Sequence, residues 1–157
     1  MNFFEQTGLL LFGTRLRRLS EQFLSEVNSI YRERGIEFDA SWFPVFFLLS
    51  QKQPISLREI ADELAVSHSA ISQLISQLQK RDLVLVQVSP EDARRKDVGL
   101  SPKGEELLST VQPVWRDMQS AMEKLVAEGQ HSRNILCAIR EIEGNMEKQS
   151  LRKRVNP

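Results

Sequence analysis

The chain has 157 residues, of which 41% are hydrophobic and 27% are charged. This composition is typical of a folded globular protein, and the length suits one compact unit or one protomer of an oligomer. Lys and Arg number 21, as do Asp and Glu. The net charge therefore gives no sign of a nucleic-acid or membrane partner, and it counts against a histone-like protein.

Cysteine usage and the apolar runs indicate the compartment. Cys137 is the only cysteine, which excludes an internal disulfide framework and a multi-cysteine metal site and favours a reducing environment. The apolar run Leu9 to Phe12 is too short for a signal peptide or a membrane span, and Glu5 precedes it where a basic region would be expected. We expect a cytoplasmic protein with no membrane partner.

Two helices are predicted before residue 55. Apolar residues at 9, 12, 16, 19, 23, 27 and 30 form one stripe of a long helix over Phe3 to Arg34, and Gly35 ends it. A shorter helix, opened by Asp39 or Ser41, carries Pro44 in its first turn, where the missing N–H has no intrahelical partner. Its nearly continuous apolar character predicts burial.

The next segment predicts a helix-turn-helix. Ser56 and Glu59 have the capping-box spacing, which opens a helix of about two turns. The apolar pattern breaks at residues 65–67, and a second helix runs from Ser67 to about Arg81. Two helices joined by a three-residue turn match the helix-turn-helix motif.

A β-hairpin and two further helices complete the chain. The strands are Leu83 to Val88 and Arg95 to Leu100. Ser101 followed by proline opens a helix to about residue 128, which Pro113 should kink, and a last helix covers residues 132–149. The fold class is mainly α with a small β-hairpin, in the order α-α-α-α-β-β-α-α.

The outward face of the second helix of the pair is polar and almost uncharged. Opposite Ile71, steps of 100° place Ser69, Ser72, Gln73, Ser76 and Lys80. Residues 67–79 carry no formal charge, whereas solvated helix faces usually carry Glu and Lys. Hydroxyl and amide groups can reach base edges or phosphates in a major groove. An ordinary solvated face is the alternative.

The hairpin turn concentrates charge. Arg94, Arg95 and Lys96 lie beside acidic residues, among them Asp92. If Asp92 folds back onto an arginine of the loop, or onto the basic end of the preceding helix, it fixes the loop while another arginine points away. A guanidinium suits the negative potential of a narrow minor groove. A solubilising turn is the alternative.

Together these residues resemble the MarR family of winged-helix transcription regulators. The most specific piece is the wing pattern Asp-x-Arg, five further residues, then Leu-Ser/Thr, which reads here Asp92, Arg94, Leu100 and Ser101. The helix-turn-helix segment resembles that of the family as well. Two departures are Ala65 in the turn and Asp82 before the first strand, where glycine is frequent in the family.

The resemblance implies a sequence-specific DNA-binding homodimer on a pseudo-palindromic operator of double-stranded DNA, a repressor that a small-molecule effector relieves. Residues 1–157 then form a single MarR-like unit with dimerisation helices in 1–35 and 130–150, a winged helix-turn-helix lobe at 39–101 and a linker helix at 101–129. The apolar stripes agree, because a small lobe could not cover them alone. The implied DNA-binding residues are Ser67, His68, Ser69, Ser72, Gln73, Ser76, Lys80, Arg94 and Arg95, with Asp92 as the wing brace.

A further prediction is an effector pocket lined by aromatic residues. Trp42, Phe46 and Trp115 could line such a pocket, and Arg15 could neutralise an anionic effector. Core packing is the alternative for the aromatic side chains, and a solvated position is the alternative for the arginine.

Other functions find little support. Cys137 lies off the apolar stripe of the last helix with no basic cluster beside it, which disfavours thiol sensing. His68 and His131 lack partners at metal-ligand spacing, and no catalytic constellation or glycine-rich phosphate loop occurs. We therefore expect no metal, no cofactor and no enzymatic activity. A winged-helix adaptor for proteins, or the regulatory part of a larger enzyme fusion, remains an alternative, and the basic tail from Ser150 is expected to be solvated.

Overall fold

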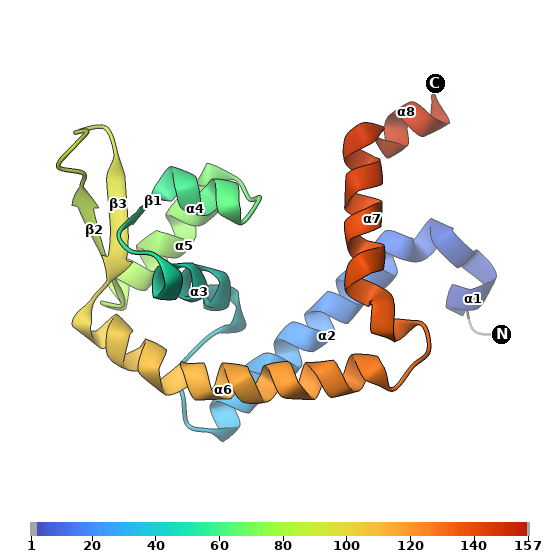
Figure 1. Cartoon of the computed structure of the whole chain (residues 1–157), viewed down its shortest axis with the longest axis horizontal. Coiled ribbons are helices and arrows are strands. Elements are labelled where there is room, and N and C mark those ends of the chain that lie inside the picture. The colour runs from blue at the N-terminus through green and yellow to red at the C-terminus, as the bar shows by residue number, and fades with distance from the viewer. Residues whose placement is uncertain (1–2, 157) are drawn as a thin grey trace. The chain divides into compact units, whose positions relative to one another are not determined.

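The computed structural model describes residues 3–156 and confirms a mainly helical fold with a small sheet (Figure 1). The order of elements matches the prediction through the hairpin, with additional short elements. In chain order they are α1 (Phe3–Thr7), η1 (Gly8–Leu11), α2 (Phe12–Glu33), η2 (Ala40–Trp42), α3 (Phe43–Gln51), β1 (Ile55–Ser56), α4 (Leu57–Glu63), α5 (His68–Lys80), β2 (Val84–Val88), β3 (Lys96–Leu100), α6 (Pro102–Ala127), η3 (Ser132–Asn134), α7 (Ile135–Lys148) and α8 (Leu151–Val155).

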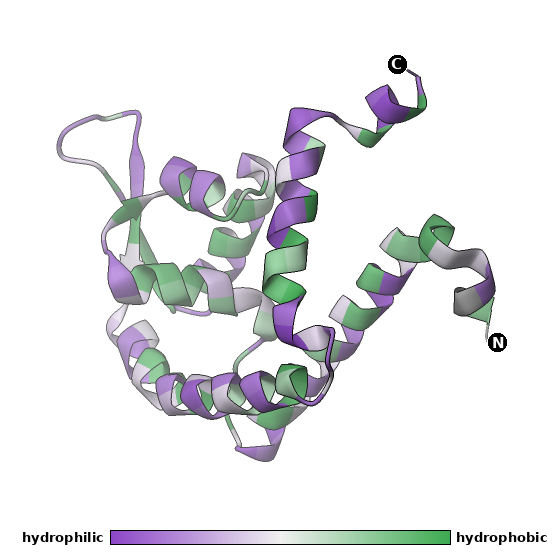
Figure 2. Ribbon diagram, turned by 45° about the vertical axis from the view of Figure 1, so that its right-hand side comes forward, coloured by the Kyte–Doolittle hydropathy of each residue, from purple (hydrophilic) through white to green (hydrophobic). Residues whose placement is uncertain are grey.

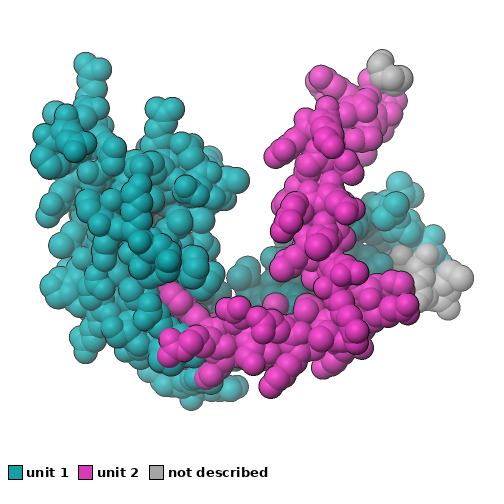
Figure 3. Space-filling model, in the orientation of Figure 1, with its two compact units in different colours: residues 1–113 teal, residues 114–157 magenta. Residues whose placement is uncertain are grey.

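The chain divides into two compact units, residues 1–113 and 114–157 (Figure 3). The boundary falls at Pro113, inside α6. The first unit holds the helix-turn-helix and the hairpin, and the second holds the end of α6 together with α7 and α8. In the part of the chain that the structure describes, no helix is long and apolar enough to cross a membrane.

Local hydrogen bonds open both helices of the helix-turn-helix, as the sequence predicts. The Ser56 hydroxyl accepts from the Glu59 N–H at 3.1 Å, and the Glu59 carboxylate accepts from the Ser56 N–H at 3.0 Å, which completes a capping box. The Ser67 hydroxyl accepts from the Ala70 N–H at 3.2 Å and caps α5. Between the two helices Ala65 takes a positive φ of 51°, the conformation that favours glycine at such turns. The inward faces bury Ile60, Ile71, Ile75 and Leu78.

A three-stranded antiparallel sheet in the order β1-β3-β2 packs beside these helices. The predicted hairpin forms with Val84 opposite Leu100 and Val88 opposite Lys96. The sequence did not predict β1, which pairs Ile55 with Val98. Two residues are too few to show an alternating pattern, so only the neighbouring strand defines them as a strand.

The start of α6 is fixed tightly against the hairpin. The Ser101 hydroxyl accepts from the Gly104 N–H at 2.9 Å and donates to the Asp82 carbonyl at 2.6 Å, which confirms the predicted cap. Asp82 has a φ of 61° and takes over the conformation that glycine commonly provides. Gly104 lies so close to Leu83 that an added Cβ would overlap the Leu83 carbonyl oxygen.

The N-terminal end of the chain differs from the sequence prediction, and the C-terminal end adds a short helix to it. The continuous helix expected from residue 3 to residue 34 is wrong, because the chain turns at Gly8, with a φ of 54°, and forms η1 before α2 begins. The last helix ends at Lys148, close to the expected end. The tail is exposed, as expected, and it also forms α8, which the Ser150 hydroxyl caps. Such a short helix has too few positions for a periodic pattern.

Two helices carry apolar faces that remain exposed in the single chain. In α2 the side chains of Leu16, Leu19 and Leu24 are 44–49% exposed. In α7 the apolar stripe consists of Ile135, Ile139, Ile142 and Met146, whose side chains are 38–56% exposed. Figure 2 shows apolar and polar residues alternating along both helices. Large apolar residues at helical spacing are usually covered in a soluble protein.

Candidate nucleic-acid interface

The predicted polar face of α5 is present and open to solvent. Ser72 is half-buried, with its hydroxyl 3.4 Å from Nδ1 of His68, and the Ser76 hydroxyl donates to the Ser72 carbonyl at 2.7 Å. The amide of Gln73 is exposed, so this face offers donors and acceptors with little charge. The exposed residues of the predicted set are Ser67, His68, Ser69, Gln73, Ser76 and Lys80.

The two wing arginines have different surroundings. Arg95 donates from Nε to Oδ1 of Asp97 at 2.7 Å and from Nη2 to Oε2 of Glu59 at 3.1 Å. These partners, Asp97 foremost, raise the pKa of Arg95 above its ordinary value. Arg94 is exposed, and within residues 3–156 its guanidinium makes no ion pair. One guanidinium is therefore held, and its neighbour points into solvent.

Asp92 folds back on the wing turn, although not onto a side chain. Its carboxylate Oδ1 accepts from the backbone N–H of Arg94 at 2.9 Å, and its carbonyl accepts from the backbone N–H of Arg95 at 2.9 Å. We had expected a contact with a guanidinium or with the basic end of α5. The backbone contacts instead set the direction in which the arginine side chains leave the turn.

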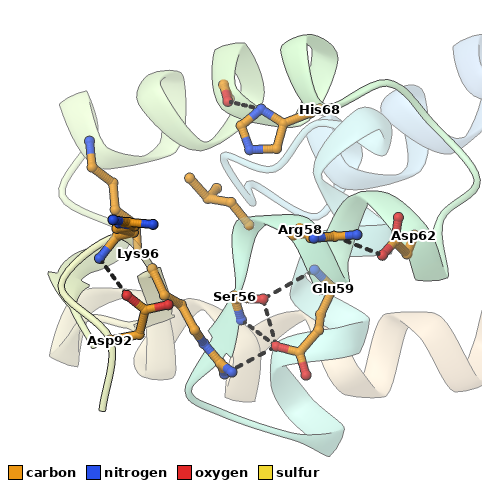
Figure 4. Close-up of a pocket in the computed structure, with 11 residues that line it drawn as sticks. Ser56, Arg58, Glu59, Asp62, His68, Asp92 and Lys96 are labelled. Carbon is orange, nitrogen blue, oxygen red and sulfur yellow. Dashed lines mark hydrogen bonds and ion pairs between the residues drawn. The ribbon is translucent and has the colours of Figure 1, made fainter. Parts of the chain in front are cut away.

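A hollow of about 830 Å³ lies between the wing, α4 and the start of α5. Figure 4 shows His68, Glu59, Asp92 and Lys96 arranged around it. Predicted residues from distant parts of the chain, among them Ser72, Arg94 and Arg95, thus share one wall. Sequence reasoning missed Arg58, and it named Lys96 without assigning it to the site, although both residues line this hollow. An exposed arginine early in α4 and a lysine at the start of β3 were the signals available.

Glu59 connects α4 to the wing and to a neighbouring lysine. Its carboxylate accepts from the Ser56 hydroxyl at 2.6 Å and from Nζ of Lys52 at 3.3 Å, as well as from Arg95. The Ser56 hydroxyl, followed by the Ser56 N–H and Lys52, lowers the pKa of Glu59 to about 2.

This lowered pKa predicts a pH-dependent contribution to stability. The ionised Glu59 carboxylate stabilises the folded state fully above pH 4.5, its ordinary pKa, and the contribution is lost as the pH falls toward 2. We expect Glu59→Gln to lower the free energy of unfolding at pH 7, with a difference from wild type that shrinks on acidification. Because the side chain is 38% exposed, solvent screening keeps the effect modest. Urea titrations at pH 7, 4 and 3 measure it, and a difference independent of pH would contradict it.

The residues predicted for an effector pocket have separate surroundings in the first unit. Phe46 is fully buried and packs 5.1 Å from the ring of Phe38, so it belongs to the core. Trp42 borders a hollow of about 290 Å³, where the Arg81 guanidinium lies 5.1 Å from its ring centroid. Arg15 lines a different hollow on α2. Trp115 is in the second unit, and its part in a pocket stays a prediction.

An exposed polar helix behind a capped turn, flanked by a hairpin with an outward arginine, defines a winged helix-turn-helix protein. Residues 37–95 match the model of the MarR family. An uncharacterized HTH-type transcriptional regulator of Staphylococcus aureus is 29% identical over 119 residues, which cover 70% of this chain and 80% of the relative. Over these residues the chain is similar to the winged helix-turn-helix of MarR-family transcription regulators.

Solved structures share the fold over most of the chain. The regulator MOSR of M. tuberculosis, crystallised in complex with DNA, matches with a TM-score of 0.71 and 21% identity over 88% of this chain and 97% of its own. BpsR of Bordetella bronchiseptica, described with regulation of its DNA binding by 6-hydroxynicotinic acid, matches with a TM-score of 0.70 and 22% identity over 91% of this chain and 96% of its own.

Proposed function

We propose that this chain is a homodimeric repressor that binds a pseudo-palindromic operator and releases it when a small molecule binds. The observation that carries the proposal is the hollow that His68 and Ser72 of α5 share with Arg94 of the wing turn. A DNA duplex presents a groove edge and phosphates to such a surface simultaneously. The DNA complex of the similar regulator MOSR supports this reading.

The face of α5 suits the major groove. Its exposed amide, Gln73, can form a bidentate pair with adenine, while the hydroxyls of Ser69 and Ser76 reach bases or phosphates. Lys80 at the far end of the helix would meet the backbone. The absence of carboxylates from α5 removes the repulsion that an ordinary surface helix would have toward DNA.

Of the two wing arginines, Arg94 is the one we assign to the minor groove. Its guanidinium is exposed, while its backbone N–H is held by Asp92. Arg95 is committed to Asp97 and Glu59, so reaching DNA would cost two ion-paired hydrogen bonds. The sequence could not separate these neighbours, and the ion pairs favour one.

The exposed apolar faces support the homodimer. Leu16, Leu19 and Leu24 of α2 and the stripe of α7 are the large surfaces that a second copy would cover. A twofold dimer places two recognition helices on two half-sites, which explains the expected palindrome. The likeness to BpsR, whose DNA binding is regulated by 6-hydroxynicotinic acid, supports a small-molecule effector, and the hollow beside Trp42 is a place for it to bind.

The test begins with selection of bound fragments from random double-stranded DNA. Enrichment of a palindrome supports an operator, whereas binding to DNA without any sequence preference would favour the adaptor alternative. With the selected operator, Arg94→Ala should lower affinity about tenfold and reduce the salt slope by about one unit, because one cation no longer displaces counterions. Gel-shift titrations from low to moderate salt measure both quantities.

A charge-matched control is Arg17→Ala. Arg17 is an exposed cation on α2 that pairs with Glu21 at 2.8 Å, far from the wing in sequence. We expect the Arg17→Ala variant to have the same operator affinity and salt slope as wild type. An unchanged Arg94→Ala variant, or equal losses in both variants, would contradict the assigned contact.

A further inference from the structure

The ion pairs of the wing extend beyond the hairpin to the helix-turn-helix. Arg95 joins Asp97 in β3 to Glu59 in α4, which is 36 positions earlier in the chain. No other side-chain ion pair among residues 3–156 links the wing turn to α4. The carboxylate of Glu59 thus connects two elements that both face the proposed DNA.

The backbone N–H and carbonyl of Arg95 are both hydrogen-bonded as well. Its N–H donates to the Asp92 carbonyl at 2.9 Å, and its carbonyl accepts from the Ser89 N–H at 2.8 Å. The turn that contains Arg94 is therefore closed on itself by hydrogen bonds, while the Arg95 guanidinium ties the closed turn to α4. Because Arg94 is the adjacent residue, this fixed backbone sets the direction in which the Arg94 side chain leaves the turn.

The anchoring end is equally constrained. Glu59 is held by the N–H and the hydroxyl of Ser56 at 3.0 and 2.6 Å, in the first turn of α4. Asp97, 11% exposed, lies opposite Ser56 in the sheet register. Two carboxylates with fixed positions hold the planar fork of a single arginine, a geometry that a lysine or a water could not reproduce.

We propose that Glu59 is a positioning residue for DNA binding, because by anchoring Arg95 on α4 it fixes the wing turn and aims Arg94 at the groove. The inference rests on the proposed function, in which Arg94 contacts DNA. Without the anchor the turn must be ordered when DNA binds, and that ordering weakens binding.

Simple electrostatics makes the opposite prediction for the same residue. Removing a carboxylate beside DNA relieves repulsion and should raise affinity. Positioning predicts that Glu59→Gln lowers operator affinity about three- to tenfold, since one immobilised side chain is lost from the free protein. Glutamine keeps the capping-box hydrogen bond to Ser56, so α4 should still form, but it loses the negative charge that pairs with Arg95.

The matched control is Asp62→Asn on the same helix. Asp62 pairs with Arg58 at 3.9 Å, and both side chains are largely exposed on the border of the same hollow. Its removal takes away one negative charge without touching the anchor. We expect operator affinity to stay unchanged or to rise in this variant.

A double-mutant cycle with Arg94→Ala separates positioning from a general loss of structure. If Glu59 acts through Arg94, then Glu59→Gln should cause no further loss of affinity in an Arg94→Ala background. Arg95→Met removes the anchor from the other side, keeps the capping box intact, and should show the same dependence on Arg94. Gel shifts with the full chain and the selected operator give all of these affinities.

The outcomes are distinct. Equal or higher affinity for Glu59→Gln, or an undiminished loss in the Arg94→Ala background, would overturn the positioning role while leaving DNA binding intact. Failure of wild type to enrich any DNA sequence would instead remove the proposed function on which the inference rests.

Discussion

Ile142→Glu should convert the protein from a dimer to a monomer and lower operator affinity about a hundredfold or more. Ile142 lies in the apolar stripe of α7 and is 42% exposed in the single chain, so a carboxylate there costs the fold of one chain little. In the proposed dimer the same carboxylate would be buried without a partner. Losing the second half-site removes the gain of bivalent binding, which is commonly 10²–10⁴-fold.

The measurements are light scattering at micromolar concentration and gel shifts on the selected operator. Cys137→Glu is the matched control, because it places the same carboxylate on an exposed position of the same helix, away from the stripe. That variant should remain dimeric and bind DNA like wild type. A wild-type protein that is monomeric, or an Ile142→Glu variant that stays dimeric, would contradict the proposed interface.

Gly104→Ala should lower the free energy of unfolding by about 1–3 kcal/mol. The added Cβ would overlap the carbonyl oxygen of Leu83 and approach the Leu100 side chain at 3.2 Å. The carbonyl cannot move away freely, since it accepts from the Ser101 N–H at 3.1 Å. The overlap therefore outweighs the gain in helix propensity, which is at most about 1 kcal/mol for replacing glycine in a helix.

Gly144→Ala tests the same substitution where space is available. Gly144 lies within α7, and nothing stands within 4 Å of a Cβ added there in the single chain. We expect its stability to be unchanged or to rise by up to about 1 kcal/mol. Urea unfolding at one fixed protomer concentration compares both variants with wild type, because dimerisation makes stability depend on concentration. Equal stabilities for the two variants would contradict the close contact at Gly104.

The sequence was most informative where structure depends on near neighbours. The capping box of Ser56 and Glu59 and the cap at Ser67 involve groups three residues apart, so spacing alone predicts them. The start of α6 at Ser101 and the hairpin were predicted for the same reason. The break at Gly8 was missed, because glycine adopts positive and negative φ with similar ease, so its presence in a periodic segment does not reveal a turn.

Contacts across long stretches of chain were not available to such reasoning. The strand β1 has two residues and exists only because β3 lies beside it. The overlap at Gly104 depends on Leu83, 21 positions earlier, and a glycine in a predicted first turn looks unremarkable in sequence. The sequence left a pocket and the core as alternatives for Phe46, and the complete burial of its side chain assigns it to the core.

By itself the sequence determined a helix-turn-helix with a neutral polar helix face, followed by a wing with two adjacent arginines. Those features follow from residue types at short, regular spacings. Only the tertiary structure decided that Arg95 is held and that Arg94 is exposed, because the partners of Arg95 include Glu59 of α4. Two identical neighbouring side chains differ only in what the fold places beside them, and that placement depends on packing between distant elements.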